Sequence, residues 1–288
     1  MSSIRTLALS AVVAMGTAAS SLGQANPPVS NTVSNVNCGG GSGDLQRAID
    51  NAPAGGTVVV RGACDKGPYY LRKNLRLTGF RGETVLSGGG DRVVDIIGAN
   101  VRIERLTVDA TQNSFGILIE EGSSGILDQV TVRNSQGSGV QAMLASYAGI
   151  TSSSFINNLY GIFVAGSSNI WLDDNTLDGN QYAHIAAFAN SSAFVYNSRL
   201  TNGNIGVLIE RMSTGDLSGN LIHGNTGPGV FLSSRVSTAS LGGNTIQQNG
   251  PDVRCDVRAL LIVDAPQTSS TQSSGIDPGC VVEGGPLF

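Results

Sequence analysis

Carboxylate side chains are the strongest candidates for chemistry in this chain of 288 residues. Two carboxyl groups held about 5 to 9.5 Å apart can give and take protons around a bond that is being cleaved. Asp95 and Glu120 are the candidates for such catalysis, and Arg72 and Gln141 are expected to join them in a ligand-binding corner. Whether these four side chains meet depends on the elements that carry them.

The histidines are weaker candidates. His184 and His223 are 39 residues apart and occupy different positions of the repeat that organises the chain. They therefore share no ligand cluster of the kind that zinc or copper needs. We expect both histidines to be structural, and we expect no metal site and no cofactor built on them.

A repeat of about 23 residues runs through most of the sequence, a period typical of stacked-repeat proteins. Three columns of residues keep this spacing. The first contains Ser152, Asn175, Asn197, Asn220 and Asn244; the second contains Asn134, Asn157, Asn180, Asn202, Asn225 and Asn249; the third contains Gly116, Gly139, Gly161, His184, Gly206, Gly229 and Val253. Stacked asparagines can hydrogen-bond along a column, so we predict asparagine ladders at the turns.

Within each repeat, apolar residues alternate in short triplets such as Leu106-Thr107-Val108 and Ile117-Leu118-Ile119. This periodicity predicts three short strands per repeat, separated by turns rich in Gly, Asn, Ser and Asp. No segment of helical length fits between the turns, which argues against a leucine-rich repeat. The prediction is an all-β coil of parallel strands, each pairing with the next coil at about 4.8 Å.

The strand after the glycine column has two outward positions in each repeat. One holds Leu118, Gln141, Phe163, Ala186, Leu208 and Phe231, and the other holds Glu120, Met143, Ala165, Phe188, Glu210 and Ser233. Glu120 and Glu210 lie four coils apart, about 19 Å, so they cannot form a catalytic pair. Leu118, Phe163, Leu208 and Phe231 form an apolar stripe that the C-terminal tail, a partner subunit in an oligomer or a ligand should cover.

The ends of the chain have their own signatures. Residues 1–25 read as a secretory signal peptide that is cleaved near Ala25, which predicts a secreted or periplasmic protein, and no later segment could span a membrane. Residues 26–56 should cap the array with a short helix that presents Leu45 and Ile49 to the core. Residues 57–263 should form the coil, and 264–288 a strand-poor polar tail. Two disulfides should pin the ends, the first joining Cys38 to Cys64 and the second joining Cys255 to Cys280.

Composition supports one repeat domain. The chain has 39 glycines and only 13% charged residues, which suits many tight turns and few helices. A net charge of -4 gives no case for binding nucleic acid.

The repeat N-x-I-x-x-N-x-x-G-I-x-L, seen in "NLIHGNTGPGVFL" from Asn220, resembles the right-handed parallel β-helix proteins of the pectin lyase-like superfamily, with NosD-like and carbohydrate-associated repeats closest in form. The resemblance covers roughly residues 40 to 265. It implies a single-stranded right-handed parallel β-helix. The superfamily contains lyases, hydrolases, epimerases and adhesins, so the resemblance specifies fold better than function.

Extension of the outward column toward the N-terminus by the same period places Asp95 before Leu118 and Arg72 before Asp95. This predicts the corner of Arg72, Asp95, Glu120 and Gln141, in a basic stretch whose arginines could hold the carboxylates of an acidic glycan. The segment "NIWLDDN" also resembles the W-I-D-H stretch of pectate lyases, which implies a calcium ligand at Asp173. Asp174 replaces the histidine of that stretch, and the Asp and His run of uronan epimerases is missing.

Three functions remain open. The chain could be an exported β-helix that associates with an acidic polysaccharide without a complete catalytic set. It could be an atypical polysaccharide lyase or uronan epimerase. It could also be a non-catalytic assembly or adhesion protein that uses the apolar stripe. Binding without product release, appearance of unsaturated or epimerised uronate, and stable oligomers without glycan affinity would distinguish them.

Overall fold

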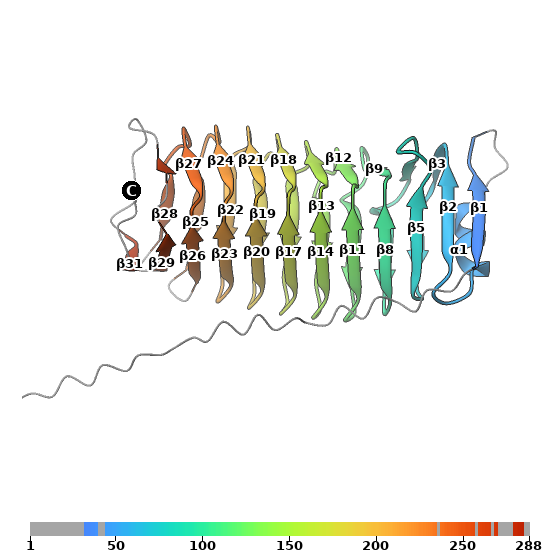
Figure 1. Cartoon of the computed structure of the whole chain (residues 1–288), viewed down its shortest axis with the longest axis horizontal. Coiled ribbons are helices and arrows are strands. Elements are labelled where there is room, and N and C mark those ends of the chain that lie inside the picture. Colours follow the sequence, from blue (N-terminus) through green and yellow to red (C-terminus); the bar gives the residue numbers. More distant parts are fainter. Residues whose placement is uncertain are drawn as a thin grey trace, which may run out of the picture.

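The structure is a computed structural model that describes residues 32–39, 44–234, 237–256, 259–265, 268–269 and 279–284. The predicted signal peptide, residues 1–25, lies outside the described residues. Almost every element is a strand, every strand pair is parallel, and the chain coils into a right-handed β-helix. Figure 1 shows the coils stacked into a rod, with the single helix beside β1 at one end and β31 at the other. The predicted fold is confirmed.

Three sheets form the walls of the rod, and each coil contributes a strand to each sheet in turn. The 12-stranded sheet contains β1 (Val33–Asn37), β2 (Thr57–Arg61), β5 (Leu75–Gly79), β8 (Asn100–Glu104), β11 (Ser124–Asp128), β14 (Tyr147–Thr151), β17 (Asn169–Asp173), β20 (Ser192–Tyr196), β23 (Thr214–Ser218), β26 (Thr238–Gly242), β29 (Leu260–Ala265) and β31 (Val281–Gly284). The 10-stranded sheet contains β3 (Ala63–Gly67), β6 (Val85–Gly88), β9 (Thr107–Asp109), β12 (Thr131–Arg133), β15 (Ser154–Ile156), β18 (Thr176–Asp178), β21 (Arg199–Thr201), β24 (Leu221–His223), β27 (Thr245–Gln247) and β30 (Thr268–Ser269).

The nine-stranded sheet carries the candidate site. It contains β4 (Tyr69–Leu71), β7 (Arg92–Ile97), β10 (Phe115–Glu120), β13 (Ser138–Ala142), β16 (Tyr160–Val164), β19 (Ala183–Ala187), β22 (Ile205–Ile209), β25 (Val230–Leu232) and β28 (Val253–Cys255). Successive side chains of a strand point to opposite faces. In β10, Ile117 and Ile119 are fully buried in the core, and Leu118 and Glu120 therefore belong to the outer face.

A polar ladder fills the turn between the 10-stranded and nine-stranded sheets, one residue later than expected in three coils. Asn158, Asn180, Asn225 and Asn249 are the ladder residues, and the Asn225 side-chain amide donates to Asn249 Oδ1 at 2.9 Å. Asn134, Asn157 and Asn202 instead adopt left-handed backbone, with φ of 65°, 57° and 60°. Their predicted place in the ladder is wrong, because the coils differ in length by a residue and a fixed period cannot separate adjacent turn positions.

The other two turns carry ladders of their own. Between the 12-stranded and 10-stranded sheets, the buried residues are Ser153, Asn175, Ser198, Asn220 and Asn244. Ser152 and Asn197, which the sequence placed in this column, adopt left-handed backbone. The third turn has a ladder of serines that the sequence did not predict, in which one residue's backbone N–H donates to the next residue's hydroxyl: Ser146, Ser168, Ser191 and Ser213. Each corner of the coil thus satisfies its buried backbone groups from the neighbouring coil.

A helix closes the N-terminal end of the core. Helix α1 (Leu45–Asn51) buries Leu45 and Ile49, and the Asp44 carboxylate caps it by accepting from the Arg47 N–H at 3.0 Å. The cap segment also supplies β1, which extends the 12-stranded sheet. At the other end, β31 follows Cys280 and pairs with β29, and the predicted strand-poor segment, residues 264–279, lies mostly outside the described residues apart from the two-residue strand β30.

The two predicted disulfides are confirmed. Cys38 bonds to Cys64 and Cys255 bonds to Cys280, with Cα atoms 5.1 and 5.0 Å apart. Each disulfide ties a terminal segment to the coil beside it. In the described part of the chain, no helix has both the length and the apolar character that a membrane span requires.

Candidate functional site

The outer face of the nine-stranded sheet presents one continuous column of side chains, one from each strand. In order from β4 to β28, the column contains Tyr70, Asp95, Leu118, Gln141, Phe163, Ala186, Leu208, Phe231 and Arg254. The predicted order from Asp95 to Phe231 agrees with this register. Its two charged residues, Asp95 and Arg254, lie near opposite ends, and the side chains between them are uncharged.

Arg72 does not lie beside Asp95 in this register, and the sequence-based placement is wrong. Tyr70 is the partner of Asp95. The coil that joins them is 25 residues long, two more than the usual period, so counting back by 23 reaches Arg72 instead. The Arg72 guanidinium stacks over the Tyr70 ring, 4.9 Å from its centroid, and still acts on the Asp95 carboxylate through space.

Arg92 is the residue that organises the charged end of this face. Its Nη1 lies 2.9 Å from Asp95 Oδ2 and 3.5 Å from Glu120 Oε1, and its Nη2 lies 2.7 Å from Asp91 Oδ2. The Asp95 and Glu120 oxygens can therefore be no further apart than the sum of the first two distances, and one small group could reach both. No sequence pattern singled out Arg92, because a spacing of three residues along a strand would place its side chain on the face opposite that of Asp95.

Burial dominates the electrostatics of the two carboxyls. Asp95 is 1% exposed, and its Oδ1 has no hydrogen-bond partner among the described residues. Burial raises the pKa of Asp95 above its ordinary value, and the Arg92 charge opposes this only in part. Burial also raises the pKa of Glu120, and the neighbouring Asp95 carboxylate raises it further. A carboxyl pair with raised pKa values is a candidate for proton transfer.

Gln141 stands apart from this charged group. Leu118, which is 3% exposed, lies between Asp95 and Gln141 in the column. The Gln141 amide accepts from the Ser138 hydroxyl at 3.2 Å and contacts Met143 Sδ at 3.4 Å. Of the four residues predicted to converge, Asp95 and Glu120 share a partner, while Arg72 and Gln141 flank them.

An aromatic patch covers the same face beyond Gln141. We define it as Tyr160, Phe163, Tyr182, Phe188 and Phe231. Phe163 stacks on Phe188 with ring centroids 5.2 Å apart, and Tyr160 contacts Phe163 and Tyr182 at 5.4 and 5.1 Å. The patch packs over buried Ala183, Ala186, Ile205 and Leu208, a hydrophobic cluster that is separate from the main core.

The apolar stripe therefore differs from its prediction. Leu118 and Leu208 are only 3% and 2% exposed, and Leu208 belongs to the small cluster against which Phe163, Phe188 and Phe231 pack. The aromatic rings remain partly exposed, and Tyr182 reaches 42%. The described strands of the tail, β30 and β31, extend the 10-stranded and 12-stranded sheets rather than covering this face. Residues 270–278 and 285–288 lie outside the described residues.

The two adjacent acids of "NIWLDDN" lie elsewhere, at the end of β17 on the 12-stranded sheet. Asp173 Oδ1 accepts from the Asn197 side chain at 2.8 Å, and Asp174 Oδ2 accepts from the Ser152 hydroxyl at 3.0 Å. Among the described residues, no three His, Cys, Asp or Glu side chains gather as a metal site would require. Calcium at Asp173 stays a prediction, carried only by the resemblance.

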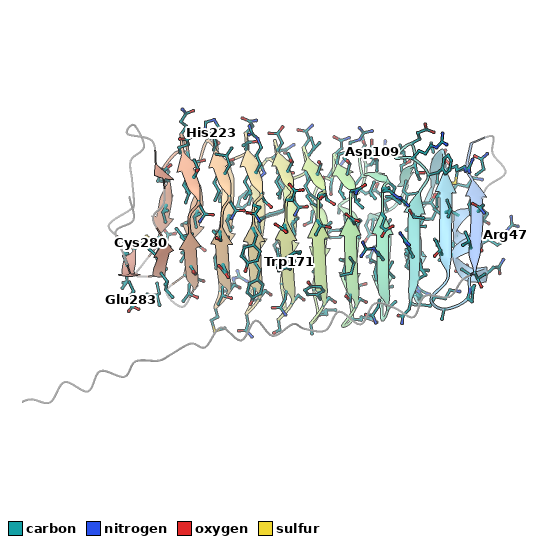
Figure 2. The ribbon with its side chains drawn as sticks, viewed as in Figure 1. Arg47, Asp109, Trp171, His223, Cys280 and Glu283 are labelled. Atoms are coloured by element: carbon teal, nitrogen blue, oxygen red, sulfur yellow. A yellow bond between two sulfur atoms is a disulfide. The ribbon has the colours of Figure 1, made fainter. Side chains whose placement is uncertain are left out.

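The histidines also occupy separate places. His184 is fully buried in the asparagine ladder, whereas His223 ends β24 on the 10-stranded sheet. Figure 2 shows His223 along the upper edge of the rod and Trp171 on the 12-stranded sheet. His184 belongs to β19 and His223 to β24, whereas the carboxyl pair of Asp95 and Glu120 belongs to β7 and β10.

Comparison with known proteins settles the family. Residues 89–266 match the family described as "Right handed beta helix region". This chain belongs to the right-handed β-helix family. Its fold is that of the pectin lyase-like superfamily. No match was found among curated protein sequences.

Solved structures agree on the fold. An alginate lyase from Paenibacillus sp. has a TM-score of 0.67 at 14% identity, over 87% of this chain and 99% of that one. Pectate lyase Pel9A has a TM-score of 0.63 at 11% identity, over 87% of this chain and 79% of that one. The A-module of the mannuronan C-5 epimerase AlgE6 from Azotobacter vinelandii has a TM-score of 0.53 at 16% identity, over 84% of this chain and 95% of that one. Identities this low establish a shared scaffold and no shared activity.

Proposed function

We propose that this protein is an exported β-helix that binds a polysaccharide along the outer face of the nine-stranded sheet. The observation that carries the proposal is the aromatic patch. It lies on the same outer face as Arg92 and its carboxylate partners Asp91, Asp95 and Glu120, and Phe163 and Phe231 share one side-chain column with Asp95. Binding sites for sugars and other small polar molecules combine aromatic walls with a few fixed polar groups. The neighbours of similar fold, named as lyases of alginate and pectate and an epimerase of mannuronan, support a polysaccharide as the ligand.

Export is part of this proposal. The sequence from Leu7 to Ala25 has the form of a signal peptide, and two disulfides favour an oxidising compartment. Secretion or the periplasm would place the face in contact with extracellular glycans.

A second candidate function is an atypical polysaccharide lyase or epimerase. Asp95 and Glu120 share Arg92 and both have raised pKa values, which is the observation in its favour. The four residues predicted to converge, which are Arg72, Asp95, Glu120 and Gln141, do not meet at one point. We therefore propose binding as the function and catalysis as its alternative.

The test is affinity electrophoresis of the mature protein through gels that contain one soluble polysaccharide each. Phe163→Ala/Phe188→Ala should abolish the retardation, while Phe194→Ala, which removes a 37% exposed ring from the 12-stranded sheet, should not. Circular dichroism confirms that each variant is folded. Equal retardation of all three proteins, or of none of them in any gel, would contradict the proposal.

The same samples distinguish the alternatives. Reducing ends, unsaturated uronate or epimerised units that accumulate with the wild type and not with Glu120→Gln would show catalysis. Sedimentation velocity tests the third possibility, because an assembly protein should form stable oligomers through the aromatic patch without any affinity for glycans.

A further inference from the structure

We infer that the glycan bound by this face is neutral rather than polyanionic, an inference that rests on the proposed function and specifies its ligand. The sequence predicts the opposite, because it places several arginines near the face. The ion pairs of the structure reverse that expectation.

Most of the arginines at this face already have carboxylate partners. Arg92 is shared among Asp91, Asp95 and Glu120. At the other end of the column, Arg211 pairs with Glu210 at 3.4 Å, and Arg254 pairs with Asp256 at 3.2 Å. Among the described residues, only Arg72 lacks such a partner at this face, and it stacks on Tyr70.

A polyuronate would bring one carboxylate with each sugar. To bind at Arg92, it would have to compete with the buried Asp95 carboxylate, which would be left without its counter-charge. Asp91 and Asp256 are 58% and 41% exposed, so their ion pairs oppose a polyuronate only weakly. The three carboxylates of Asp91, Asp95 and Glu120 outnumber the two guanidinium groups that act on them, Arg92 and the more distant Arg72, so a further anion would meet net repulsion there. Burial is the main cause of the raised pKa of Glu120, and the neighbouring Asp95 carboxylate raises that pKa further.

The remainder of the face suits a neutral sugar chain. Within the aromatic patch, Tyr160, Phe163 and Tyr182 offer rings against which the C–H face of a pyranose can pack. The other two rings, Phe188 and Phe231, have the guanidinium groups of Arg211 and Arg254 over them, at 6.0 and 4.8 Å from the ring centroids. The hydroxyls of Tyr160 and Tyr182 and the amide of Gln141 are hydrogen-bonding groups without charge, suited to sugar hydroxyls. Strands repeat at about 4.8 Å along the column, which is close to the length of one sugar in an extended chain.

The test is isothermal titration of the full mature protein with two sets of hexasaccharides. The neutral set contains cellohexaose, laminarihexaose and mannohexaose, and the anionic set contains hexamers of galacturonate, mannuronate and guluronate. At least one neutral hexasaccharide should bind about ten-fold more tightly than every uronate. Its affinity should change less than about two-fold between 20 and 500 mM salt, because no ion pair forms on binding.

Three variants locate and characterise the site. Phe163→Ala should abolish neutral binding, and Phe163→Tyr, which keeps the ring, should retain it. Phe194→Ala on the 12-stranded sheet is the matched control and should bind like the wild type. Glu120→Gln should raise the affinity for uronates, since it removes one carboxylate that competes for Arg92.

The outcomes separate the inference from the proposed function. A uronate that binds more tightly than every neutral sugar, and is released by salt, would overturn the neutral ligand while leaving glycan binding intact. Neutral binding that survives Phe163→Ala would overturn the assigned face. An absence of binding by all six hexasaccharides at millimolar concentration, together with no retardation by any polysaccharide gel, would overturn both.

Discussion

The imidazole of His184 lies where a side chain on Gly203 would otherwise extend the asparagine ladder. A Cβ on Gly203 would come within 2.6 Å of His184 Nε2, so position 203 has no room for a side chain while His184 occupies this place. His184 Nδ1 lies 2.8 Å from the Asn180 amide nitrogen, and Nε2 lies 3.0 Å from Asn225 Oδ1. The imidazole thus connects Asn180 to Asn225 across the coil in which Gly203, which has no side-chain amide, occupies the ladder position.

This geometry requires a neutral imidazole. Asn180 Oδ1 already accepts from Asn158, so its amide nitrogen faces His184 as a donor and Nδ1 must accept. Nε2 then carries the proton and donates to Asn225. Burial lowers the pKa of His184 to about 4, although Asn225 and the more distant Asp178 charge favour protonation.

We predict that His184 makes the fold sensitive to acid. The folded state resists protonation between pH 6.5 and about 4, whereas the unfolded chain accepts the proton. The stabilisation by His184 is therefore complete above pH 6.5 and is lost as pH falls through 4, by up to about 3 kcal/mol. Urea unfolding from pH 7.5 to 4 of wild type and His184→Ala should show the gap between them narrowing by about this amount.

The corrected ladder gives a second prediction. Asn225 is 2% exposed and donates to the Leu200 carbonyl and to Asn249 Oδ1. Asn225→Leu should lower the free energy of unfolding by about 2 to 4 kcal/mol, because buried partners lose their hydrogen bonds. Asn202 sits one residue before the ladder position, in left-handed backbone, so Asn202→Gly should cost less than about 1 kcal/mol. Similar losses in the two variants, measured by denaturant unfolding, would contradict the revised ladder.

The carboxyl pair gives a third prediction. The Asp95 carboxylate contributes to the raised pKa of Glu120. Asp95→Asn keeps the shape and removes the charge, so the pKa of Glu120 should fall. Carbon-detected NMR titration of the Glu120 carboxyl measures this directly. Glu210→Gln changes a carboxyl four coils away and should leave the Glu120 titration unchanged, and an unchanged titration in Asp95→Asn would show that the two groups do not interact.

The leader gives a fourth prediction. A signal peptide that ends at Ala25 should be absent from the exported protein, whose first residue should be Asn26. N-terminal sequencing of protein recovered from the periplasm or medium checks the position. Full-length protein that keeps Met1 and stays inside the cell would contradict export.

The sequence by itself determined the scaffold, because a solenoid repeats one local pattern many times. Alternating triplets such as Ile117-Leu118-Ile119 specify strands, the period specifies stacking, and the four cysteines flank the ends of the array that they tie. These features are local, so they could be predicted without knowing which coils pair. The order of the outward column from Asp95 to Phe231 followed for the same reason.

Only the tertiary structure decided what the coils bring together. Because one coil has 25 residues, Tyr70 and not Arg72 lies beside Asp95. Because the turns differ in length by one residue, Asn158 and not Asn157 occupies the ladder position. The side-chain directions that join Arg92 to Glu120 on the next coil, and His184 to Asn225 41 positions away, follow no sequence period. A repeat specifies which strand follows which, but charges and hydrogen bonds depend on distances of a few ångströms, which packing between coils sets.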